Sequence, residues 1–142
     1  MTLLCATTEH LEGLFALELA CFEAKDSPLS KRALRYHLMR GRIIGAFEGK
    51  TLLGYILIFP RTIPRVYSLA VHPNARGRGI AQALIKEALH VKEKLRLEVR
   101  SDNHGAIALY EKLGFTCKGV KKEFYPDGCD AKVYMYSPTH TR

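Results

Sequence analysis

The stretch Arg76-Gly77-Arg78-Gly79-Ile80-Ala81 decides how this chain is interpreted. It follows a short apolar run typical of a strand, Val66-Tyr67-Ser68-Leu69-Ala70-Val71, and it opens an amphipathic run typical of a helix, Ile80 to Val91. The first N–H groups of a helix lack intrahelical partners, and the helix dipole favours negative charge there. Glycines let a phosphate approach the backbone, and the two arginines can add charge-assisted hydrogen bonds. The order of these elements therefore predicts a site for the pyrophosphate of a nucleotide-like cofactor.

The glycines of this turn also have simpler or different interpretations. A tight turn from strand to helix can need glycine for its backbone alone. A dinucleotide-binding fingerprint would require a third Gly or Ala where Gln82 stands, and a P-loop would require Gly-Lys-Ser/Thr at its end. The residues exclude the last two motifs and leave a phosphate cradle or a purely structural turn.

Helical and extended patterns alternate along the rest of the chain. Thr7 and Thr8 are candidate caps for a first helix whose apolar stripe would be Leu11, Leu14, Phe15, Leu19 and Phe22. We expect further helices over residues 30–39, 79–93 and 103–113. We expect strands over residues 42–48, 51–59, 65–71, 94–100, 116–124 and 130–137.

The order of these segments predicts the fold class. Strands 65–71 and 94–100 are joined by a helix, so they should lie parallel, whereas the hairpins before and after them should be antiparallel. We therefore expect one α/β (α+β) domain over residues 1–142, with a mixed central sheet of about seven strands and about four helices on both faces.

The composition is that of a soluble globular protein. Of 142 residues, 47% are hydrophobic and 25% are charged, which argues against disorder. No apolar run approaches the roughly 20 residues of a membrane span, and the N-terminal stretch lacks the basic start of a signal peptide. We expect a cytoplasmic protein with no membrane partner. The cysteines form no C-x-x-C pair, so free thiols and no metal site are expected: Cys5, Cys21, Cys117 and Cys129.

The basic balance has two interpretations. The net charge of +8 could attract a nucleic acid, a ribosome or a phosphorylated cofactor, or it could be a solvated positive surface. The basic residues are spread along the chain, without a basic run interleaved with aromatic residues. We therefore expect no direct reading of nucleic acid. For the oligomeric state, which no sequence feature determines, we expect a monomer or weak dimer.

Three stretches resemble the GNAT acetyltransferase superfamily. Leu69-Ala70-Val71-His72-Pro73, followed by Arg76-x-x-Gly79-x-Ala81, is similar to its signature Gln/Arg-x-x-Gly-x-Gly/Ala. The stretches Leu97 to Asn103 and Ala106 to Phe115 fit the same superfamily, and they look most like its ribosomal-protein-alanine N-acetyltransferases. The resemblance covers residues 67–136, about half of the chain.

The resemblance implies acetyl-CoA as the co-substrate. Its pyrophosphate would bind the N–H groups of residues 77–82, its pantetheine arm would lie between the two parallel strands and bond to the backbone of Leu69 and Val71, and Asn103 would contact the pantetheine end. The implied cofactor-binding residues are Leu69, Ala70, Val71, Arg76, Gly77, Arg78, Gly79, Ile80, Ala81, Gln82 and Asn103.

The resemblance also implies two catalytic residues. Glu98 would be the general base, acting through a water, and Tyr110 would give a proton to the CoA thiolate. The Val71 N–H would bond to the thioester oxygen. Other interpretations are an ion pair of Glu98 with Arg96 or Arg100, and a core role for Tyr110.

The acceptor is implied less directly. Acetyl transfer requires a deprotonated amine, and an N-terminal amine, with a reference pKa near 8, loses its proton more easily than a lysine near 10.4. The Pro-Trp-Ser of the alanine acetyltransferases is replaced by Ser27-Pro28-Leu29-Ser30, whereas Tyr125-Pro126 and Asp130-Ala131 are kept. We expect a peptide or protein N-terminus, such as that of a ribosomal protein. The alternatives are a lysine or small amine, or a noncatalytic module that binds acetyl-CoA or nucleic acid.

Overall fold

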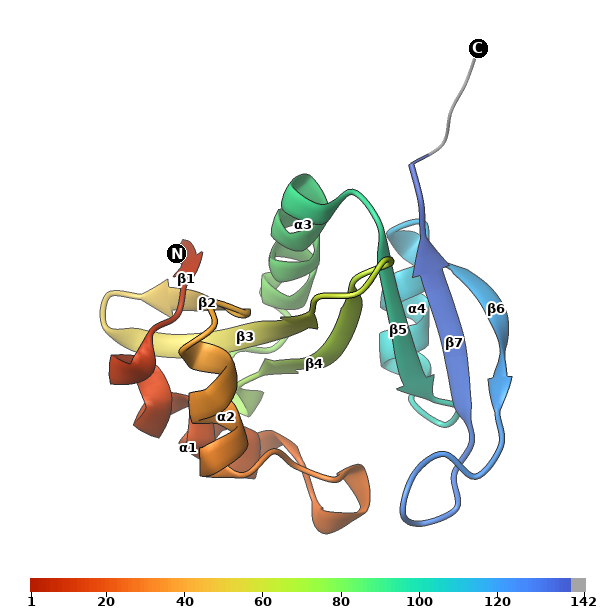
Figure 1. Ribbon diagram of the computed structural model, residues 1–142, viewed down its shortest axis with the longest axis horizontal. Coiled ribbons are helices and arrows are strands. Elements are labelled where there is room, and N and C mark those ends of the chain that lie inside the picture. Colours follow the sequence, from red (N-terminus) through yellow and green to blue (C-terminus); the bar gives the residue numbers. More distant parts are fainter. Residues whose placement is uncertain (139–142) are drawn as a thin grey trace.

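The computed structural model describes residues 1–138, without the side chain of Lys25, so residues 139–142 of the expected domain lie outside it. One seven-stranded sheet, in the order β1-β2-β3-β4-β5-β7-β6, carries helices on both faces (Figure 1). The strands are β1 (Thr2–Cys5), β2 (Ile43–Glu48), β3 (Thr51–Phe59), β4 (Arg65–Val71), β5 (Leu95–Arg100), β6 (Thr116–Lys121) and β7 (Ala131–Tyr136). The helices are α1 (Leu11–Cys21), α2 (Lys31–Leu38), α3 (Ile80–Lys92) and α4 (His104–Lys112), with short 3-10 turns η1 (Thr8–His10), η2 (Ala24–Asp26) and η3 (Pro73–Ala75).

The predicted fold class and sheet are confirmed. β4 and β5 are parallel, and the other neighbouring pairs in the sheet are antiparallel. The six predicted strands all form, although β6 ends at Lys121 rather than at residue 124. The sequence pattern did not locate β1, an edge strand paired with β2, because its exposed residues do not alternate with buried ones.

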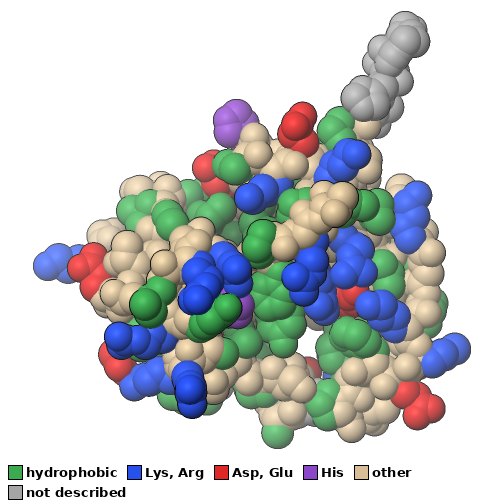
Figure 2. Space-filling view, viewed as in Figure 1, with side chains coloured by type: hydrophobic (Ala, Val, Ile, Leu, Met, Phe, Trp, Pro, Cys, Tyr) green, Lys and Arg blue, Asp and Glu red, His purple; other side chains and the backbone are tan. Residues whose placement is uncertain are grey.

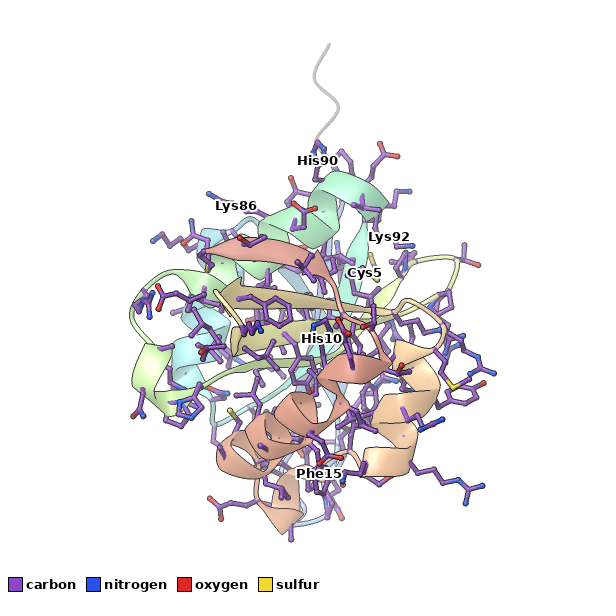
Figure 3. The ribbon with its side chains drawn as sticks, turned by 90° about the vertical axis from the view of Figure 1, so that its left-hand side faces the viewer. Cys5, His10, Phe15, Lys86, His90 and Lys92 are labelled. Atoms are coloured by element: carbon purple, nitrogen blue, oxygen red, sulfur yellow. The ribbon has the colours of Figure 1, made fainter. Side chains whose placement is uncertain are left out.

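Two hydrophobic layers cover the two faces of the sheet. α1 and α2 pack on one face around Leu14, Leu34 and Tyr55, and α3 and α4 pack on the other around Leu84 and Tyr134. Figure 3 shows α1 and α2 below the sheet and α3 above it, with Lys86, His90 and Lys92 pointing outward from α3. No helix within residues 1–138 is long and apolar enough to cross a membrane.

The expected apolar stripe of α1 is wrong at one position. Leu19 is 60% exposed, whereas Leu14, Leu17 and Glu18 face the core. These three positions follow the spacing of one helical face, and Leu19 lies off it. The apolar pattern does not reveal this face, because one of its buried positions is occupied by Glu18.

A β-bulge at Tyr67 shapes the centre of the sheet. Ser68 lies opposite Leu57 and Val66 lies opposite Ile58, so Tyr67 is an extra residue in β4. A bulge bends its strand. β4 pairs with β5 only at Arg65–Arg96 and Val66–Leu97, before the bulge, and then diverges from it.

Candidate active site

A cavity of about 980 Å³ lies where β4 and β5 diverge. Side chains from α1, the start of α3, α4 and the loop between β6 and β7 complete its wall. Its volume lies at the upper end of the range for small-molecule sites. The predicted site residues that line it are Leu69, Ala70, Val71, Arg76, Gly77, Gly79, Ile80, Ala81, Gln82, Glu98, Asn103 and Tyr110.

The backbone of β4 presents polar groups to this cavity. The N–H of His72 donates to the Leu53 carbonyl on β3, at 2.8 Å. Because alternate residues of an antiparallel strand bond to the same neighbour, Ala70 also faces β3, and Leu69 and Val71 face the gap. The Val71 carbonyl accordingly accepts hydrogen bonds from side chains outside β3.

The start of α3 forms the far end of the cavity. Gly77 and Gly79 have φ values of 82° and 77°, in the left-handed region that favours glycine. The first helical hydrogen bond runs from Ala83 N to Gly79 O, at 3.0 Å. The N–H groups of Ile80, Ala81 and Gln82 precede it and lack a carbonyl one turn earlier, which makes them an anion-binding end.

The two arginines of this turn, Arg76 and Arg78, have different partners. Arg76 lines the cavity, and its Nε donates to the Val71 carbonyl at 3.1 Å. Arg78 is absent from the cavity wall in the described residues, and its Nη2 pairs with Glu48 Oε2 at 2.9 Å on the surface. A role for Arg78 in holding a phosphate therefore requires that its side chain leave Glu48.

Glu98 occupies the cavity wall inside a cluster of cations. Its side chain is 2% exposed and lies 2.7 Å from Arg65 Nε, 2.9 Å from Lys121 Nζ and 3.2 Å from Arg96 Nη1. Figure 2 shows Lys and Arg side chains gathered over β5 around a recessed acidic group. Burial raises the pKa of Glu98, but Lys121 and Arg65 outweigh it, and the net pKa is lowered. The ion pair with Arg96 is present, and the one with Arg100 is not.

Tyr110 lies at the opposite wall, on α4. It is 7% exposed, and its ring packs 5.7 Å from that of Phe115, so it belongs to the core and to the cavity wall at once. Burial, with a smaller contribution from Tyr125, raises the pKa of its hydroxyl. The hydroxyl therefore stays protonated at neutral pH, as a proton donor must.

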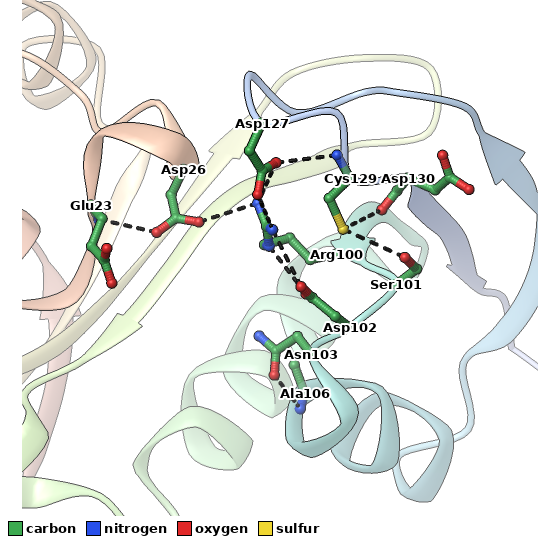
Figure 4. A network of polar contacts seen from close by, with 10 residues as sticks. All are labelled: Glu23, Asp26, Arg100, Ser101, Asp102, Asn103, Ala106, Asp127, Cys129 and Asp130. Atoms are coloured by element: carbon green, nitrogen blue, oxygen red, sulfur yellow. Dashed lines mark hydrogen bonds and ion pairs between the residues drawn. The ribbon is translucent and has the colours of Figure 1, made fainter.

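Asn103 and Arg100 lie in the cavity wall between η2 and the loop that joins β6 to β7, a region called here the mouth of the cavity. The side-chain oxygen of Asn103 caps α4 by accepting from Ala106 N at 3.1 Å. Arg100 binds three carboxylates from different segments, with distances of 3.1 Å to Asp102, 2.7 Å to Asp127 and 3.6 Å to Asp26 (Figure 4). One guanidinium thus joins η2, the end of β5 and the loop between β6 and β7.

Glu18 is a cavity residue that sequence reasoning missed. It is 2% exposed on α1 and lines the same cavity. Its carboxylate accepts hydrogen bonds from the Tyr55 hydroxyl and, at 2.7 Å, from Leu29 N. A single acidic residue at a core-facing helix position was the signal that could have revealed it. No group of three or more His, Cys, Asp or Glu within residues 1–138 is arranged to hold a metal ion.

Known proteins of similar sequence match only part of this chain. The N-alpha-acetyltransferase RimI of Mycobacterium tuberculosis is 40% identical over 96 residues, which cover 62% of this chain and 61% of that protein. The ribosomal protein bS18-alanine N-acetyltransferase of Escherichia coli K12 is 36% identical over 80 residues, covering 51% and 54%. The chain thus spans less than two thirds of the length of these curated relatives.

Solved structures match over nearly the whole chain. The crystal structure of the ribosomal-protein-S18-alanine N-acetyltransferase from Escherichia coli has a TM-score of 0.83 and 23% identity, covering 99% of this chain and 97% of that one. That of Ard1 from Thermoplasma volcanium has a TM-score of 0.86 and 20% identity, covering 98% of each chain. At these identities the likeness shows the fold. The model of the acetyltransferase (GNAT) family matches residues 11–115, well over half of the sequence, and the chain belongs to that family.

Proposed function

We propose that this protein is an acetyl-CoA-dependent N-acetyltransferase that acetylates a protein N-terminal amine. The observation that carries the proposal is the gap between β4 and β5, which leads from Glu98 and Tyr110 to the glycine-flanked start of α3. The two curated relatives above are named as N-alpha- and ribosomal-protein-alanine acetyltransferases. Family membership and this cavity together favour an enzyme over a noncatalytic binding module.

The residues of the cavity fit an elongated thioester with a pyrophosphate. Leu69 and Val71 would bond to the amides of its pantetheine arm, as a neighbouring strand would. Ile80, Ala81 and Gln82 would bind the pyrophosphate through their N–H groups. Added Cβ atoms at Gly77 and Gly79 meet no other atom within 4 Å, so their surface is open for a ligand to approach.

The chemistry requires a polarised carbonyl and a protonated leaving group. The thioester supplies an activated acetyl group when bound. The Val71 N–H would donate to its carbonyl oxygen, and Tyr110 would give its proton to the sulfur. The resemblance implies Glu98 as the base, but its lowered pKa and three neighbouring cations make its carboxylate a weak proton acceptor.

The acceptor is the finer part of the proposal. The relative from Escherichia coli is named for an alanine of ribosomal protein bS18, which supports a ribosomal-protein N-terminus in the cytoplasm. The cavity is lined by Tyr125 and Pro126 of the late hairpin and by Asp26 and Ser27 near the end of α1. A chain end can approach between these two segments.

A thiol-release assay with acetyl-CoA tests this proposal. N-terminal peptides, N-terminally blocked lysine peptides and polyamines would be compared at equal concentration. We expect turnover that is fastest with free N-terminal peptides. Turnover only with polyamines or blocked lysine peptides would overturn the acceptor class, and no turnover with any amine would overturn the enzyme assignment.

A further inference from the structure

The buried carboxylate of Glu18 lacks a cationic partner within the described residues. Its two hydrogen bonds come from neutral donors, the Tyr55 hydroxyl and Leu29 N. Burying an ionised carboxylate without a countercharge is costly, and such groups gather at functional sites. A neutral side chain could accept the hydrogen bond from Leu29 N equally well. This hydrogen bond therefore does not explain why an acidic residue occupies position 18.

A continuous set of hydrogen bonds connects Glu18 with the cavity. The Tyr55 hydroxyl, on β3, binds Glu18 on one side and lies 2.9 Å from Ser68 Oγ on the other. Ser68 lies on β4 and lines the cavity, directly before Leu69. Each hydroxyl can donate one proton and accept another. A proton can therefore pass from the cavity to Glu18 through two side chains.

We propose that Glu18, reached through Ser68 and Tyr55, accepts the proton that the acceptor ammonium must lose. This role rests on the acetyltransferase function proposed above. The ammonium proton moves to Ser68 Oγ, the Ser68 proton to the Tyr55 oxygen, and the Tyr55 proton to the carboxylate. The neutral amine then forms its C–N bond as the C–S bond of the thioester breaks. The thiolate takes the Tyr110 proton, the second proton lost by the nitrogen restores the Tyr110 hydroxyl, and the proton held by Glu18 passes to water.

The surroundings of Glu18 suit this role better than those of Glu98 do. Burial raises the pKa of Glu18, against the opposing effect of its hydrogen bonds to Tyr55 and Leu29. Two further titratable groups near Glu18, among the described residues, are Cys21, on the same helix, and Arg76, which interacts with Cys21. A base whose pKa lies closer to the working pH takes a proton more readily. Glu98 faces Arg65, Arg96 and Lys121 instead.

Glu18→Gln is the direct test. Its amide can accept from Leu29 N and donate to the Tyr55 oxygen, because the Tyr55 hydroxyl can turn to donate to Ser68. We expect the variant to fold and its kcat to fall about 100-fold near pH 6.5. The defect should shrink above about pH 8, where the free amine needs no base. Glu12→Gln, on the exposed face of the same helix, is the matched control and should behave as wild type.

Two further variants separate proton transfer from structure. Tyr55→Phe removes the central hydroxyl while the hydrogen bond from Leu29 to Glu18 is kept, and we expect the same pH-dependent loss of kcat. Glu98→Gln should lower kcat by a factor that stays the same as the pH rises, because Glu98 binds Arg65, Arg96 and Lys121 rather than taking up the proton. A Glu18→Gln defect that is equal at all pH values, or absent, overturns the role of Glu18 but leaves the acetyltransferase proposal intact.

A titration of the free protein needs no turnover. Carboxyl ¹³C signals of labelled glutamates would be followed from about pH 3 to 8, and Glu18 would be assigned by its absence in Glu18→Gln. We expect it to titrate above the ordinary value of 4.5. Titration at or below that value overturns the proton-acceptor role even if the wild type proves to be an active acetyltransferase. A wild type without thiol release overturns the acetyltransferase proposal and, with it, this role.

Discussion

Arg100 holds the carboxylate of Asp127 through two hydrogen bonds, from Nη2 to Oδ2 at 2.7 Å and from Nη1 to Oδ1 at 3.2 Å. Arg100 ends β5, and Asp127 lies in the loop between β6 and β7, so the pair fixes that loop beside the cavity. Arg100 lowers the pKa of Asp127 to about 2, which keeps the pair ionised at any physiological pH. The same guanidinium reaches Asp26 on the other side of the cavity mouth.

Arg100→Lys should loosen the mouth of the cavity. A lysine ammonium cannot form the two parallel hydrogen bonds that a guanidinium makes with a carboxylate. We expect the KM for the peptide acceptor to rise about tenfold, equivalent to roughly 1.4 kcal/mol of binding free energy, with a smaller change for acetyl-CoA. Steady-state kinetics with each substrate varied in turn checks this. Arg32→Lys, on the exposed surface of α2, is the control, and equal KM values in both variants would refute the anchoring role.

Gly79→Ala should weaken acetyl-CoA binding and destabilise the fold. The φ of Gly79 is 77°, and an L-residue with a Cβ pays roughly 1–2 kcal/mol there. The added methyl group also lies where the pyrophosphate would approach the start of α3. Urea unfolding and calorimetric titration with CoA measure the two effects. Gly13→Ala, in the exposed first turn of α1, where φ is negative, is the control and should stabilise the protein by about 0.5–1 kcal/mol.

The ion pairs of Glu98 should appear in the pH dependence of stability. Its folded-state pKa lies below the ordinary value of 4.5, so its stabilising effect is present above 4.5 and is lost as the pH falls through the folded value. We expect Glu98→Gln to be less stable than wild type at neutral pH, because Arg65, Arg96 and Lys121 then repel one another uncompensated. Urea unfolding from about pH 3 to 7 should show the two proteins converging at the acid end. A constant difference across that range would contradict this assignment.

Tyr110→Phe should separate chemistry from packing. The ring of Tyr110 packs against Phe115, and that contact survives the loss of the hydroxyl. We expect kcat to fall at least tenfold, towards the usual general-acid contribution of about 10²–10⁴, while the midpoint of urea unfolding stays close to that of wild type. Tyr36→Phe, on α2 outside the cavity wall, is the control. An unchanged kcat would leave Tyr110 as a core residue only.

The sequence revealed those features that depend on near neighbours in the chain. The alternation of Leu95–Arg100 and the glycines before α3 determine local backbone structure, and both appear as predicted. Features that depend on distant segments were missed. Lys121 is 23 residues from the carboxylate of Glu98 that it binds, and Arg78 turns to Glu48, 30 residues earlier. Neither pairing leaves a local pattern, because the sheet order brings these segments together.

Deletion of Tyr67 tests whether the bulge opens the cavity. Tyr67 is the extra residue between two pairs, Leu57 with Ser68 and Ile58 with Val66. Its removal makes the pairing with β3 continuous, and the side chains before and after it stay on their present faces of the sheet. β4 should then continue alongside β5, and the N–H groups of Leu69 and Val71 should pair with it rather than face the gap. We expect a folded protein with slower hydrogen exchange at these two amides.

The same deletion should abolish CoA binding in calorimetric titration. Tyr67→Ala is its control, because this variant keeps the extra residue and loses only the ring that stacks on Phe59, with centroids 4.5 Å apart. It should therefore bind CoA nearly as well as wild type. If the deletion variant folds and still binds CoA, the divergence of β4 from β5 has another origin. The remaining candidate would be the covering of β4 by α1, whose Cys21 Sγ lies 3.3 Å from the Val71 carbonyl.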